Sequence, residues 1–369
     1  MKKKVLVAMS GGVDSSVAAY LLKQQGYEVV GVTMCLGIAD TEDASHTKCC
    51  GVRAIDDAKE VCRFLDVPHY VLDFSGEMKE YIINDFVSEY LNGRTPNPCV
   101  RCNEYLKFGK LFDYAKTMGF DYFATGHYAR IEETAGEFYL LRGRDRKKDQ
   151  TYFLYGIARE KLSSLLFPLG EYTKDGVRKV AENAQLKVAQ KPQSQDICFI
   201  ARGGYKEFIA GYVKEGCRVQ GHGWRGPGME PGEIVTREGK VIGTHPGIIH
   251  YTLGQREGLG VAVGRPLYVS RLDARKNQVV VGDKEDLYTN TVEIDEIHLL
   301  VDEVPENVAA QIRYAHIPAS CQCMLKDSRG HVRFKEPQAA VTPGQSLVFY
   351  SGDRVCGGGI IRASYQERS

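Results

Sequence analysis

Apolar and polar positions follow two alternating patterns through the first third of the chain. Short apolar runs, which are typical of buried strands, lie at residues 5–9, 28–34, 69–74 and 122–124. Between these runs, apolar residues recur every three or four positions, which predicts helices at residues 17–25, 54–65, 78–91 and 104–118. Strands that alternate with helices predict a parallel sheet, whose ligands bind at the carboxyl ends of its strands.

The pattern changes in the rest of the chain. A hairpin is predicted at residues 130–141, and helical periodicity returns at 151–160, 174–184 and 205–213. Residues 221–264 are rich in Gly and Pro, and β alternation then dominates, with strands expected at 291–297, 309–314, 321–325, 331–334 and 346–350. We expect an α/β fold of three domains: a parallel-sheet catalytic domain at 1–205, a small β-rich domain at 206–277 and a β-barrel-like domain at 278–369.

Composition limits the classes of protein to which the chain can belong. It has 369 residues, a formal net charge of +1 and 11 cysteines. An odd number of cysteines does not suit a secreted disulfide framework, so a reducing compartment, the cytoplasm, is expected. The apolar runs fall short of the ~20 residues of a membrane span, and the balanced charge gives no general attraction to DNA, so neither a membrane nor DNA is an expected partner.

The sequence Ser10-Gly11-Gly12-Val13-Asp14-Ser15-Ser16 joins the first predicted strand to the first predicted helix. Its glycines suit a tight turn, and its hydroxyl residues suit a helix N-cap. Backbone N–H groups and the positive end of the helix dipole would favour a phosphate there. Because Asp14 would repel a phosphate, its carboxylate makes most sense beside Mg²⁺.

The whole string resembles the phosphate loop of the ATP-pyrophosphatases, which cleave ATP between its α- and β-phosphates. It is not a Walker A loop, because Gly-Lys-Ser/Thr does not follow. A second strand end, Thr125-Gly126-His127, is expected at the same edge of the sheet. Both strand ends would then face one nucleotide pocket.

Two cysteines lie close together in Asn97-Pro98-Cys99-Val100-Arg101-Cys102-Asn103, just before a predicted helix. A thiol near a helix N-terminus, with Arg94 and Arg101 close in sequence, is expected to have a lowered pKa and to be a better nucleophile. Half of a zinc site is the alternative, but it requires a second Cys-x-x-Cys pair, which the sequence lacks. Cys198 lies apart, where a buried small thiol would be the ordinary interpretation.

Eight strings together resemble the bacterial tRNA-specific 2-thiouridylases, the MnmA family. They are SGGVDSS, GRTPNPCVRCN, ATGHYAR, KKDQTYFLY, SQDICFI, HPGIIHYTLGQREGLG, IRYAHIP and TPGQSLVFY, in this order over essentially the whole chain. The resemblance implies an ATP-dependent tRNA sulfurtransferase. Such an enzyme adenylates the C2 oxygen of the wobble uridine in tRNA anticodons and replaces it with sulfur from a protein persulfide, giving 2-thiouridine, AMP and pyrophosphate.

The resemblance also implies roles for single residues. Cys102 aligns with the family's nucleophile and Cys198 with the cysteine that receives the persulfide, and a disulfide between them would form during turnover. The residues that would bind the nucleotide are Ala8, Met9, Ser10, Gly11, Gly12, Val13, Asp14, Ser15, Met34 and Gly126. Those that would contact the target base or the rest of the tRNA are Asn97, Pro98, Cys99, His127, Lys148, Asp149, Gln150, Arg313, Tyr314 and Gln345. The sulfur donor would be a cysteine desulfurase or a sulfur relay protein.

Cys99 departs from the family pattern, which often has Asp at this position as a proposed acid/base group. A thiol is a poorer acid/base group than a carboxylate near neutral pH. Two roles are open for Cys99. It could serve as a resolving thiol, or it could join Cys102 and Cys198 as ligands of an iron–sulfur cluster with one open iron site.

Five basic residues lie close together at Arg142, Arg144, Arg146, Lys147 and Lys148. Such a run is usually a solvated surface, but here it would also suit the phosphates of an anticodon stem. Two other classes of function stay open. One is a synthetase of the same superfamily that adenylates a small acid or amidine and needs neither thiol. The other is a redox- or iron-sensing RNA-binding protein that does not turn over ATP.

Overall fold

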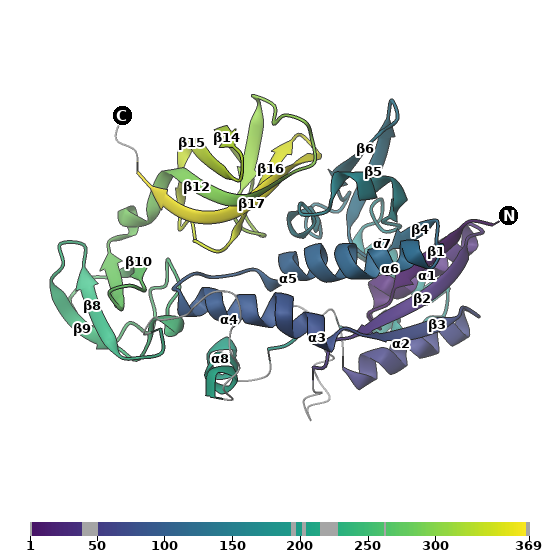
Figure 1. Cartoon of the computed structure of the whole chain (residues 1–369), viewed down its shortest axis with the longest axis horizontal. Helices are drawn as coiled ribbons and strands as arrows, with labels where there is room; N and C mark the ends of the chain where they lie inside the picture. The colour runs from purple at the N-terminus through teal and green to yellow at the C-terminus, as the bar shows by residue number, and fades with distance from the viewer. Residues whose placement is uncertain are drawn as a thin grey trace. The chain divides into compact units, whose positions relative to one another are not determined.

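The computed structural model describes residues 2–38, 51–192, 197–200, 204–214, 228–261 and 263–366. The chain divides into two compact units, and Figure 1 shows their elements. Unit 1 comprises Met1–Tyr81, Cys99–Ala201 and Asp353–Val355. Unit 2 comprises Ile82–Pro98, Arg202–Gly352 and Cys356–Ser369. Each unit is therefore assembled from segments that are far apart in the sequence.

A parallel sheet forms the centre of unit 1, and it has five strands in the described part of the chain. In spatial order they are β3 (His69–Asp73), β2 (Glu28–Cys35), β1 (Lys4–Ala8), β4 (Tyr122–Ala124) and β7 (Leu165–Leu166). Val7 of β1 is level with Gly31 of β2 and with Ala124 of β4. The parallel sheet that the sequence predicts is confirmed, and the carboxyl ends of its strands lie at one edge.

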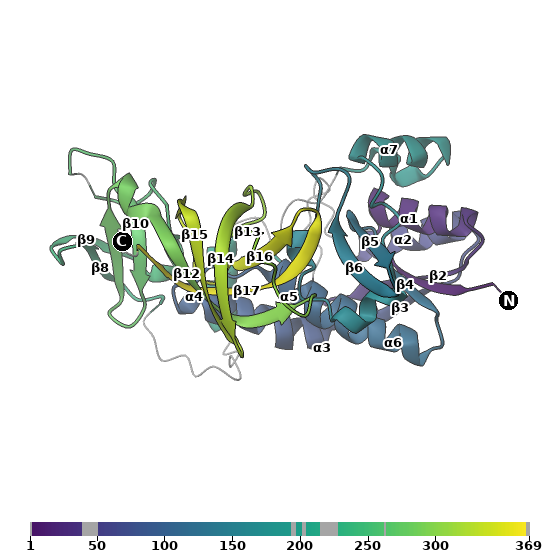
Figure 2. The ribbon, with the colours of Figure 1, turned by 90° about the horizontal axis from the view of Figure 1, so that it is seen from above.

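Successive side chains of a strand face opposite sides of its sheet, and Figure 2 shows the helices α1 (Val13–Gln24) and α7 (Lys174–Asn183) on one side of this sheet. On one side, Val7 lies in a buried apolar cluster with residues of α1 (Val13–Gln24), α2 (Val52–Phe64) and α7 (Lys174–Asn183). On the other side, the ring of Phe123 packs edge-on against Phe108, with ring centroids 5.9 Å apart. The helices predicted at 17–25, 54–65 and 174–184 are thus confirmed as α1, α2 and α7.

The predicted helices at 78–91 and 104–118 both begin earlier than expected. The first follows α3 (Ser75–Glu77) and consists of η1 (Met78–Ile83) and α4 (Asn84–Leu91). The second consists of α5 (Pro98–Arg101), η2 (Cys102–Leu111) and α6 (Phe112–Thr117). A helix that starts only after the two cysteines is therefore a wrong prediction. Proline suits the first turn of a helix, where its missing N–H is not needed, so the helix begins at Pro98.

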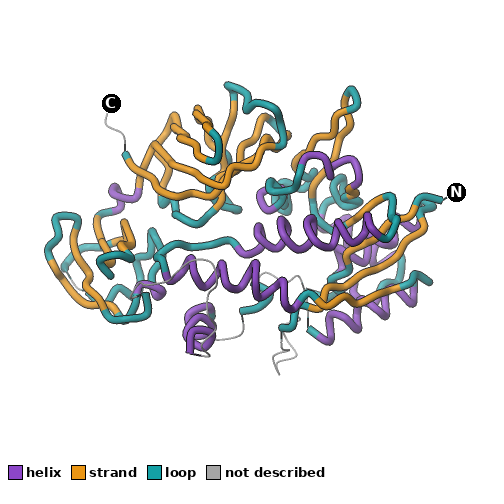
Figure 3. The backbone as a smooth tube through the Cα atoms, in the orientation of Figure 1, coloured by secondary structure: helices purple, strands orange, loops and turns teal. Residues whose placement is uncertain are grey.

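The predicted hairpin is confirmed as β5 (Ala129–Thr134) and β6 (Glu137–Arg142), which Figure 3 shows as an antiparallel pair. Ala135 and Gly136 at its tip have φ angles of 54° and 83°. A two-residue hairpin turn of this kind needs both central residues in the left-handed region.

The helix predicted at 151–160 is wrong. The structure has two short 3₁₀ turns instead, η3 (Thr151–Phe153) and η4 (Arg159–Ser164). The carboxylate of Asp149 accepts hydrogen bonds from both the N–H and the hydroxyl of Thr151. Such side-chain bonds compete with a regular helix, which explains the difference. A further 3₁₀ turn, η5 (Lys187–Gln190), follows α7.

A small sheet in unit 2 has the spatial order β10 (Tyr268–Asp273), β11 (Gln278–Gly282), β8 (Gly232–Thr236) and β9 (Val241–His245). Its core is formed by buried apolar side chains that include Ile234, Val269 and Val279. Two short 3₁₀ turns belong to the same region: η6 (Ile248–His250) comes before β10 in the sequence, and η7 (Lys284–Leu287) comes after β11. In the same unit, α8 (Tyr205–Lys214) packs on α4 through stacked rings of Tyr205 and Tyr90, whose centroids are 4.5 Å apart.

The last part of unit 2 is a closed barrel. Its six strands in the described residues follow the order β12, β15, β14, β13, β16 and β17, and β12 pairs with β17 to close the ring. Their bounds are β12 (Tyr288–Leu299), β13 (Val308–Gln311), β14 (Ala319–Lys326), β15 (Arg329–Ala339), β16 (Ser346–Ser351) and β17 (Arg354–Tyr365). Buried side chains such as Val292, Phe334 and Phe349 fill the interior, as a small barrel requires.

The strand predicted at 309–314 ends three residues early, at Gln311. The side-chain amide of Gln311 donates to the carbonyl oxygens of Arg313 and Tyr314, so the chain turns there rather than extending. Over the described residues, the helices are all too short or too polar to cross a bilayer.

Candidate nucleotide and thiol site

The predicted phosphate loop lies at the carboxyl end of β1, where the chain turns into α1. Gly11 has a φ of 67°, in the left-handed region that favours glycine. A Cβ atom on Gly11 would lie 2.2 Å from the carbonyl oxygen of Ala54 in α2. Glycine is therefore needed here both for the turn and for the close contact with α2.

Serine side chains of the loop bind groups within the loop itself. The hydroxyls of Ser15 and Ser16 donate to the carbonyl oxygen of Gly12 at 3.2 Å and 2.8 Å. The N–H of Ser10 donates to Ser15 Oγ at 3.1 Å. The predicted hydroxyl N-cap is wrong, because Gly12 occupies that position and has no side chain to cap the helix. The first N–H groups of α1 are thus the groups that an anion would meet.

The loop after β4 touches the phosphate loop, as expected for two strand ends at one edge of a sheet. A Cβ atom on Gly126 would lie 2.7 Å from the nitrogen of Ser15 and 2.7 Å from the carbonyl carbon of Asp14. A residue with a side chain could not approach the start of α1 so closely. Met34, half-buried near the end of β2, belongs to the same edge.

The carboxylate of Asp14 is held by two residues from distant parts of unit 1. Lys174 Nζ lies 2.7 Å and 2.8 Å from its two oxygens, and the hydroxyl of Tyr128 donates to Oδ1 at 2.8 Å. Burial, followed by the charge of Asp14, raises the pKa of Tyr128, so this hydroxyl keeps its proton and remains a donor. One local feature of the sequence could have drawn attention to Lys174. It is a basic residue in the first turn of a predicted helix, where the helix dipole disfavours a positive charge.

A second lysine contacts the backbone of the loop. Lys191 Nζ donates to the carbonyl oxygen of Gly11 at 2.8 Å and also binds the carboxylate of Asp57 in α2. Lys191 lies 180 positions after Gly11, so local sequence patterns do not connect the two residues. Lys191 lies seven positions before Cys198 in the sequence.

The three predicted thiols all belong to unit 1. Cys102 is half-buried at the start of η2, Cys99 is exposed in α5, and Cys198 is half-buried in a turn. Residues 194–196 of the Cys198 string lie outside the described residues. The approach of Cys102 to Cys198 and their disulfide stay predictions.

Asn103 fixes the helix that carries Cys102. Its side chain is 2% exposed, and its amide donates to the carbonyl oxygen of Phe153 at 3.0 Å. Lys107 Nζ donates to the other end of the same amide at 3.0 Å. A buried amide with partners on both sides holds the first turn of η2 against the η3 turn, and so positions Cys102.

The two arginines expected to favour a thiolate each have an acidic partner. Arg94 binds Glu89, and Arg101 lies 3.5 Å from the carboxylate of Glu104. The lowered thiol pKa expected from these arginines stays a prediction. Among the described residues, three or more His, Cys, Asp or Glu side chains do not gather in a way that could hold a metal ion. The iron–sulfur ligand set of Cys99, Cys102 and Cys198 stays a prediction.

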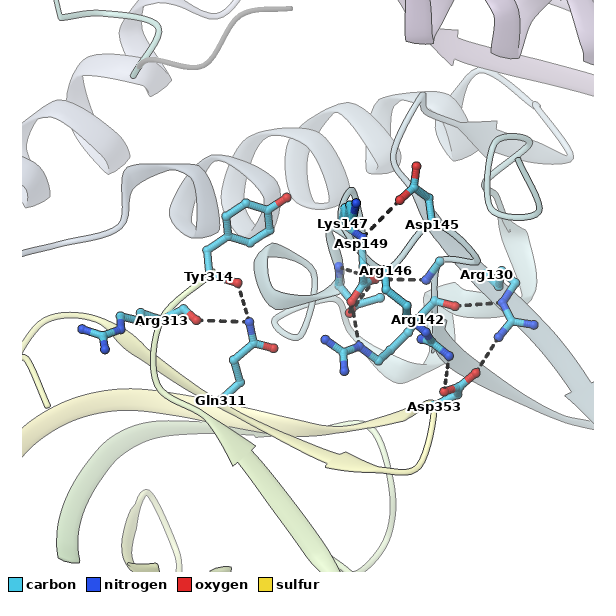
Figure 4. A network of polar contacts seen from close by, with 12 residues as sticks. Arg130, Arg142, Asp145, Arg146, Lys147, Asp149, Gln311, Arg313, Tyr314 and Asp353 are labelled. Atoms are coloured by element: carbon cyan, nitrogen blue, oxygen red, sulfur yellow. Dashed lines mark hydrogen bonds and ion pairs between the residues drawn. The ribbon is translucent and has the colours of Figure 1, made fainter. Parts of the chain in front are cut away.

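Asp149, expected at a tRNA contact, lies inside its loop (Figure 4). Its side chain accepts hydrogen bonds from Arg142 Nε at 2.8 Å and from the N–H of Gly143 at 3.0 Å, in addition to those from Thr151. Its neighbour Gln150 accepts a bond from the N–H of Tyr128 at 2.9 Å. Both side chains hold the loop in shape, while Lys148 is half-exposed beside them.

The basic cluster at 142–148 divides into paired and exposed members. Arg142 binds Asp149, and Arg146 binds Asp353, which also lies 2.9 Å from Arg130. The hydrogen bond from Arg146, and then the charges of these arginines, lower the pKa of Asp353. Arg144 and Lys147 are exposed, so the side of the cluster that could meet a phosphate is smaller than its sequence suggests.

Two glutamines in unit 2 organise segments predicted to meet tRNA. Gln311, only 3% exposed, holds the carbonyl oxygens of Arg313 and Tyr314, at 3.1 Å and 2.6 Å (Figure 4). Gln345 donates to the carbonyl oxygen of Thr95 at 2.7 Å, just before the segment predicted to meet the target base. This bond positions the Thr95 backbone, and the direct contact of Gln345 with tRNA, which the resemblance implies, stays a prediction.

His127 is half-buried between aromatic rings. Its ring lies 5.9 Å from Phe108 and 6.3 Å from Phe167, and Thr125 Oγ1 lies 2.7 Å from its Nδ1. Burial, followed by the charge of Lys107, holds the pKa of His127 well below its ordinary value. The imidazole is therefore neutral at pH 7, and any contact with tRNA would be a hydrogen bond rather than an ion pair.

Comparisons with known proteins cover almost the whole chain. Family models described as the tRNA methyl transferase HUP domain, the tRNA methyl transferase PRC-barrel domain and the aminomethyltransferase beta-barrel domain match residues 3–202, 226–283 and 289–361. The tRNA-specific 2-thiouridylase MnmA 1 of Syntrophus aciditrophicus is 49% identical over 98% of this chain and 93% of its own length. The tRNA-specific 2-thiouridylase MnmA of Moorella thermoacetica is 45% identical over 98% of this chain and 100% of its own length.

The chain belongs to the tRNA-specific 2-thiouridylase family. The family identified from eight short strings is therefore confirmed, together with the α/β fold class. These relatives do not support a synthetase for small acids or a sensor without ATP turnover, and the assignment of single site residues stays a prediction.

Proposed function

We propose that this protein adenylates the C2 oxygen of the wobble uridine in tRNA anticodons and replaces it with sulfur. The observation that carries the proposal is the near full-length relationship to tRNA-specific 2-thiouridylases, at 49% identity over 98% of the chain. The HUP domain match over residues 3–202 supports the use of ATP, and the phosphate loop and the Gly126 loop, which touch, both lie within these residues.

The loop's part in the reaction is to hold phosphates while the base oxygen attacks the α-phosphate. The first N–H groups of α1 supply donors, and the helix dipole favours negative charge at that end. Ala8 to Ser15, with Met34 and Gly126, form the proposed nucleotide site. Mg²⁺ would neutralise phosphate charge when bound, and Asp14 is the loop's carboxylate for it. Once it is adenylated, the C2 oxygen leaves as part of AMP, whereas the oxygen of an unmodified carbonyl is a poor leaving group.

The proposed sulfur chemistry uses the two thiols. The terminal sulfur of a persulfide on Cys198 attacks C2, and AMP leaves with the former C2 oxygen. The Cys102 thiolate then attacks the inner sulfur, which breaks the sulfur–sulfur bond, leaves C2 doubly bonded to sulfur and forms a Cys102–Cys198 disulfide. A thiol reductant must reduce this disulfide before the next turnover. In the alternative order of steps, the Cys102 thiolate attacks the inner sulfur of the Cys198 persulfide before C2 is attacked, and the outer sulfur is released as sulfide.

The partners follow from this chemistry. The substrate is a tRNA whose wobble base must leave the anticodon stack to reach the site. The sulfur comes from a cysteine desulfurase or a sulfur relay protein, and the expected compartment is the cytoplasm. A cluster route, with Cys99, Cys102 and Cys198 as ligands, is the alternative.

The proposal is tested by incubating the protein with ATP, a cysteine desulfurase, cysteine and total tRNA, followed by nucleoside analysis. We expect 2-thiouridine together with equal amounts of AMP and pyrophosphate. Cys102→Ser and Cys198→Ser should each abolish thiolation, while Cys323→Ser, a half-buried thiol of the barrel, should not. Absence of thionucleoside with the unmodified protein would overturn the function, and near-normal thiolation by either of the first two variants would overturn the thiol mechanism. Iron and sulfide counts after anaerobic purification distinguish the cluster route.

A further inference from the structure

The cation of Lys174 binds Asp14, in the first turn of α1 and near the end of the predicted phosphate loop. We propose that Lys174 is a phosphate-binding residue of the nucleotide site. Asp14 binds the Lys174 ammonium while the site is empty, and the ammonium binds the phosphates when ATP enters. This inference rests on the proposed use of ATP and adds a residue to its site.

The geometry of the ion pair places the ammonium at the loop. Lys174 Nζ lies 2.7 Å and 2.8 Å from the carboxylate oxygens of Asp14, and the hydroxyl of Tyr128 shares one of them at 2.8 Å. Lys174 is only 8% exposed, so its charge acts in a poorly screened environment. Asp14 is the second residue of α1, next to Ser15 and in contact with Gly126. The ammonium is therefore bound to a side chain of the first turn of α1, the turn whose N–H groups would bind a phosphate.

The position of Lys174 is poorly explained by helix stability. It is the first residue of α7, where the positive end of the helix dipole disfavours a cation. The first backbone N–H groups of α7 have hydrogen-bond acceptors that do not involve the Lys174 side chain. Thr173 Oγ1 accepts from the N–H of Gly176, and the Asp145 carboxylate accepts from the N–H of Lys174. The cation is therefore explained by its contact with Asp14 of the phosphate loop and not by the stability of α7.

The arrangement also resolves the difficulty of an acidic residue in a phosphate loop. Without a nucleotide, Asp14 neutralises a buried ammonium that would otherwise lack an anion. When phosphates enter, they compete for the same ammonium, and the carboxylate becomes available to a cation that accompanies ATP. One lysine thus balances the charge of the site in both states.

A purely structural tie is the alternative. Because α1 and α7 share one apolar cluster, in which Val17 and Val177 lie, the ion pair could serve only to join the two helices. Such a tie would affect adenosine and ATP alike when it is broken. A phosphate-binding lysine would affect ATP alone, since adenosine carries no phosphate.

The test measures the binding of ATP and of adenosine by calorimetry on the full chain with Mg²⁺ removed by EDTA. We expect Lys174→Met to weaken ATP binding at least tenfold and to leave adenosine binding unchanged. Lys179→Met is the matched control, because Lys179 is an exposed lysine of the same helix, and it should bind both ligands normally. Equal loss of ATP and adenosine binding, or no loss of either, would overturn the proposal.

A second pair of variants keeps the test sound if Lys174→Met leaves Asp14 unpaired and fails to fold. Asp14→Asn alone should bind ATP at least as tightly as the unmodified protein without Mg²⁺, because a negative charge beside the phosphates is gone. The double variant Asp14→Asn, Lys174→Met leaves neither charge buried alone, and it should bind ATP at least tenfold more weakly than Asp14→Asn. Equal affinity of these two variants would show that Lys174 only neutralises Asp14. If the unmodified protein bound no ATP, the proposed function itself would fail, which is a different result.

Discussion

The ammonium group of Lys191 donates a 2.8 Å hydrogen bond to the carbonyl oxygen of Gly11, 180 positions earlier in the chain. The same ammonium binds Asp57, so one side chain ties the phosphate loop, α2 and the end of η5 together. Its side chain is largely buried, at 17% exposure. These contacts predict that Lys191 matters for the stability of the loop.

Lys191→Met should lower the free energy of unfolding by about 1–3 kcal/mol, because a carbonyl oxygen and a carboxylate lose their donor. The matched control is Lys187→Met, which removes a mainly exposed ion pair with Glu60 and should change stability little. Urea denaturation followed by circular dichroism measures both. If the two variants unfolded at the same urea concentration, the bond to Gly11 would have no measurable role.

Gln345 is expected to act on catalysis through the backbone that it holds. Gln345→Leu removes the bond to the carbonyl oxygen of Thr95 and should lower kcat/KM for tRNA by about fivefold to tenfold, the equivalent of about 1–1.4 kcal/mol. ATP affinity should not change. Gln338→Leu is the control, because it removes a similar amide bond to Glu336 within the barrel. A drop of the same size in the control would mean that barrel stability, not the Thr95 segment, causes the effect.

His127 predicts a pH dependence of stability with a definite sign. Its folded pKa lies well below the ordinary value of 6.5, so the unfolded state takes up a proton that the folded state does not. The resulting stability is present above about pH 6.5 and is lost as the pH falls below it. Between about pH 7.5 and about pH 5.5, the thermal midpoint of the unmodified protein should therefore fall more than that of His127→Asn. Parallel pH profiles for the two proteins would contradict this.

Lys147 and Lys148 carry the prediction for the basic cluster. Replacing both with Ala should weaken tRNA binding and reduce the slope of log affinity against log salt concentration by about 1.5, since each phosphate contact contributes slightly less than one. Lys240 and Lys276, exposed lysines in the turns between strands of the small sheet, provide the control pair with the same change of charge. An unchanged slope would show that the cluster is ordinary solvated surface.

Much of the fold was predictable because its signals are local. Apolar runs and helical periodicity identify strands such as β2 and helices such as α7, and Ala135-Gly136 marks a hairpin turn. The failures have local causes as well. Pro98 starts a helix that periodicity placed later, and the side chains of Asp149 and Gln311 bend the backbone where a regular element was expected.

The sequence by itself determined the family, the parallel α/β fold and the phosphate loop, because each depends on contiguous residues whose order carries the signal. Only the tertiary structure decided how Asp14, Gly11 and Thr95 are held, since their partners Lys174, Lys191 and Gln345 lie 160, 180 and 250 positions away. A hydrogen bond depends on distance in space, and a folded chain brings such residues together without leaving a pattern along the sequence.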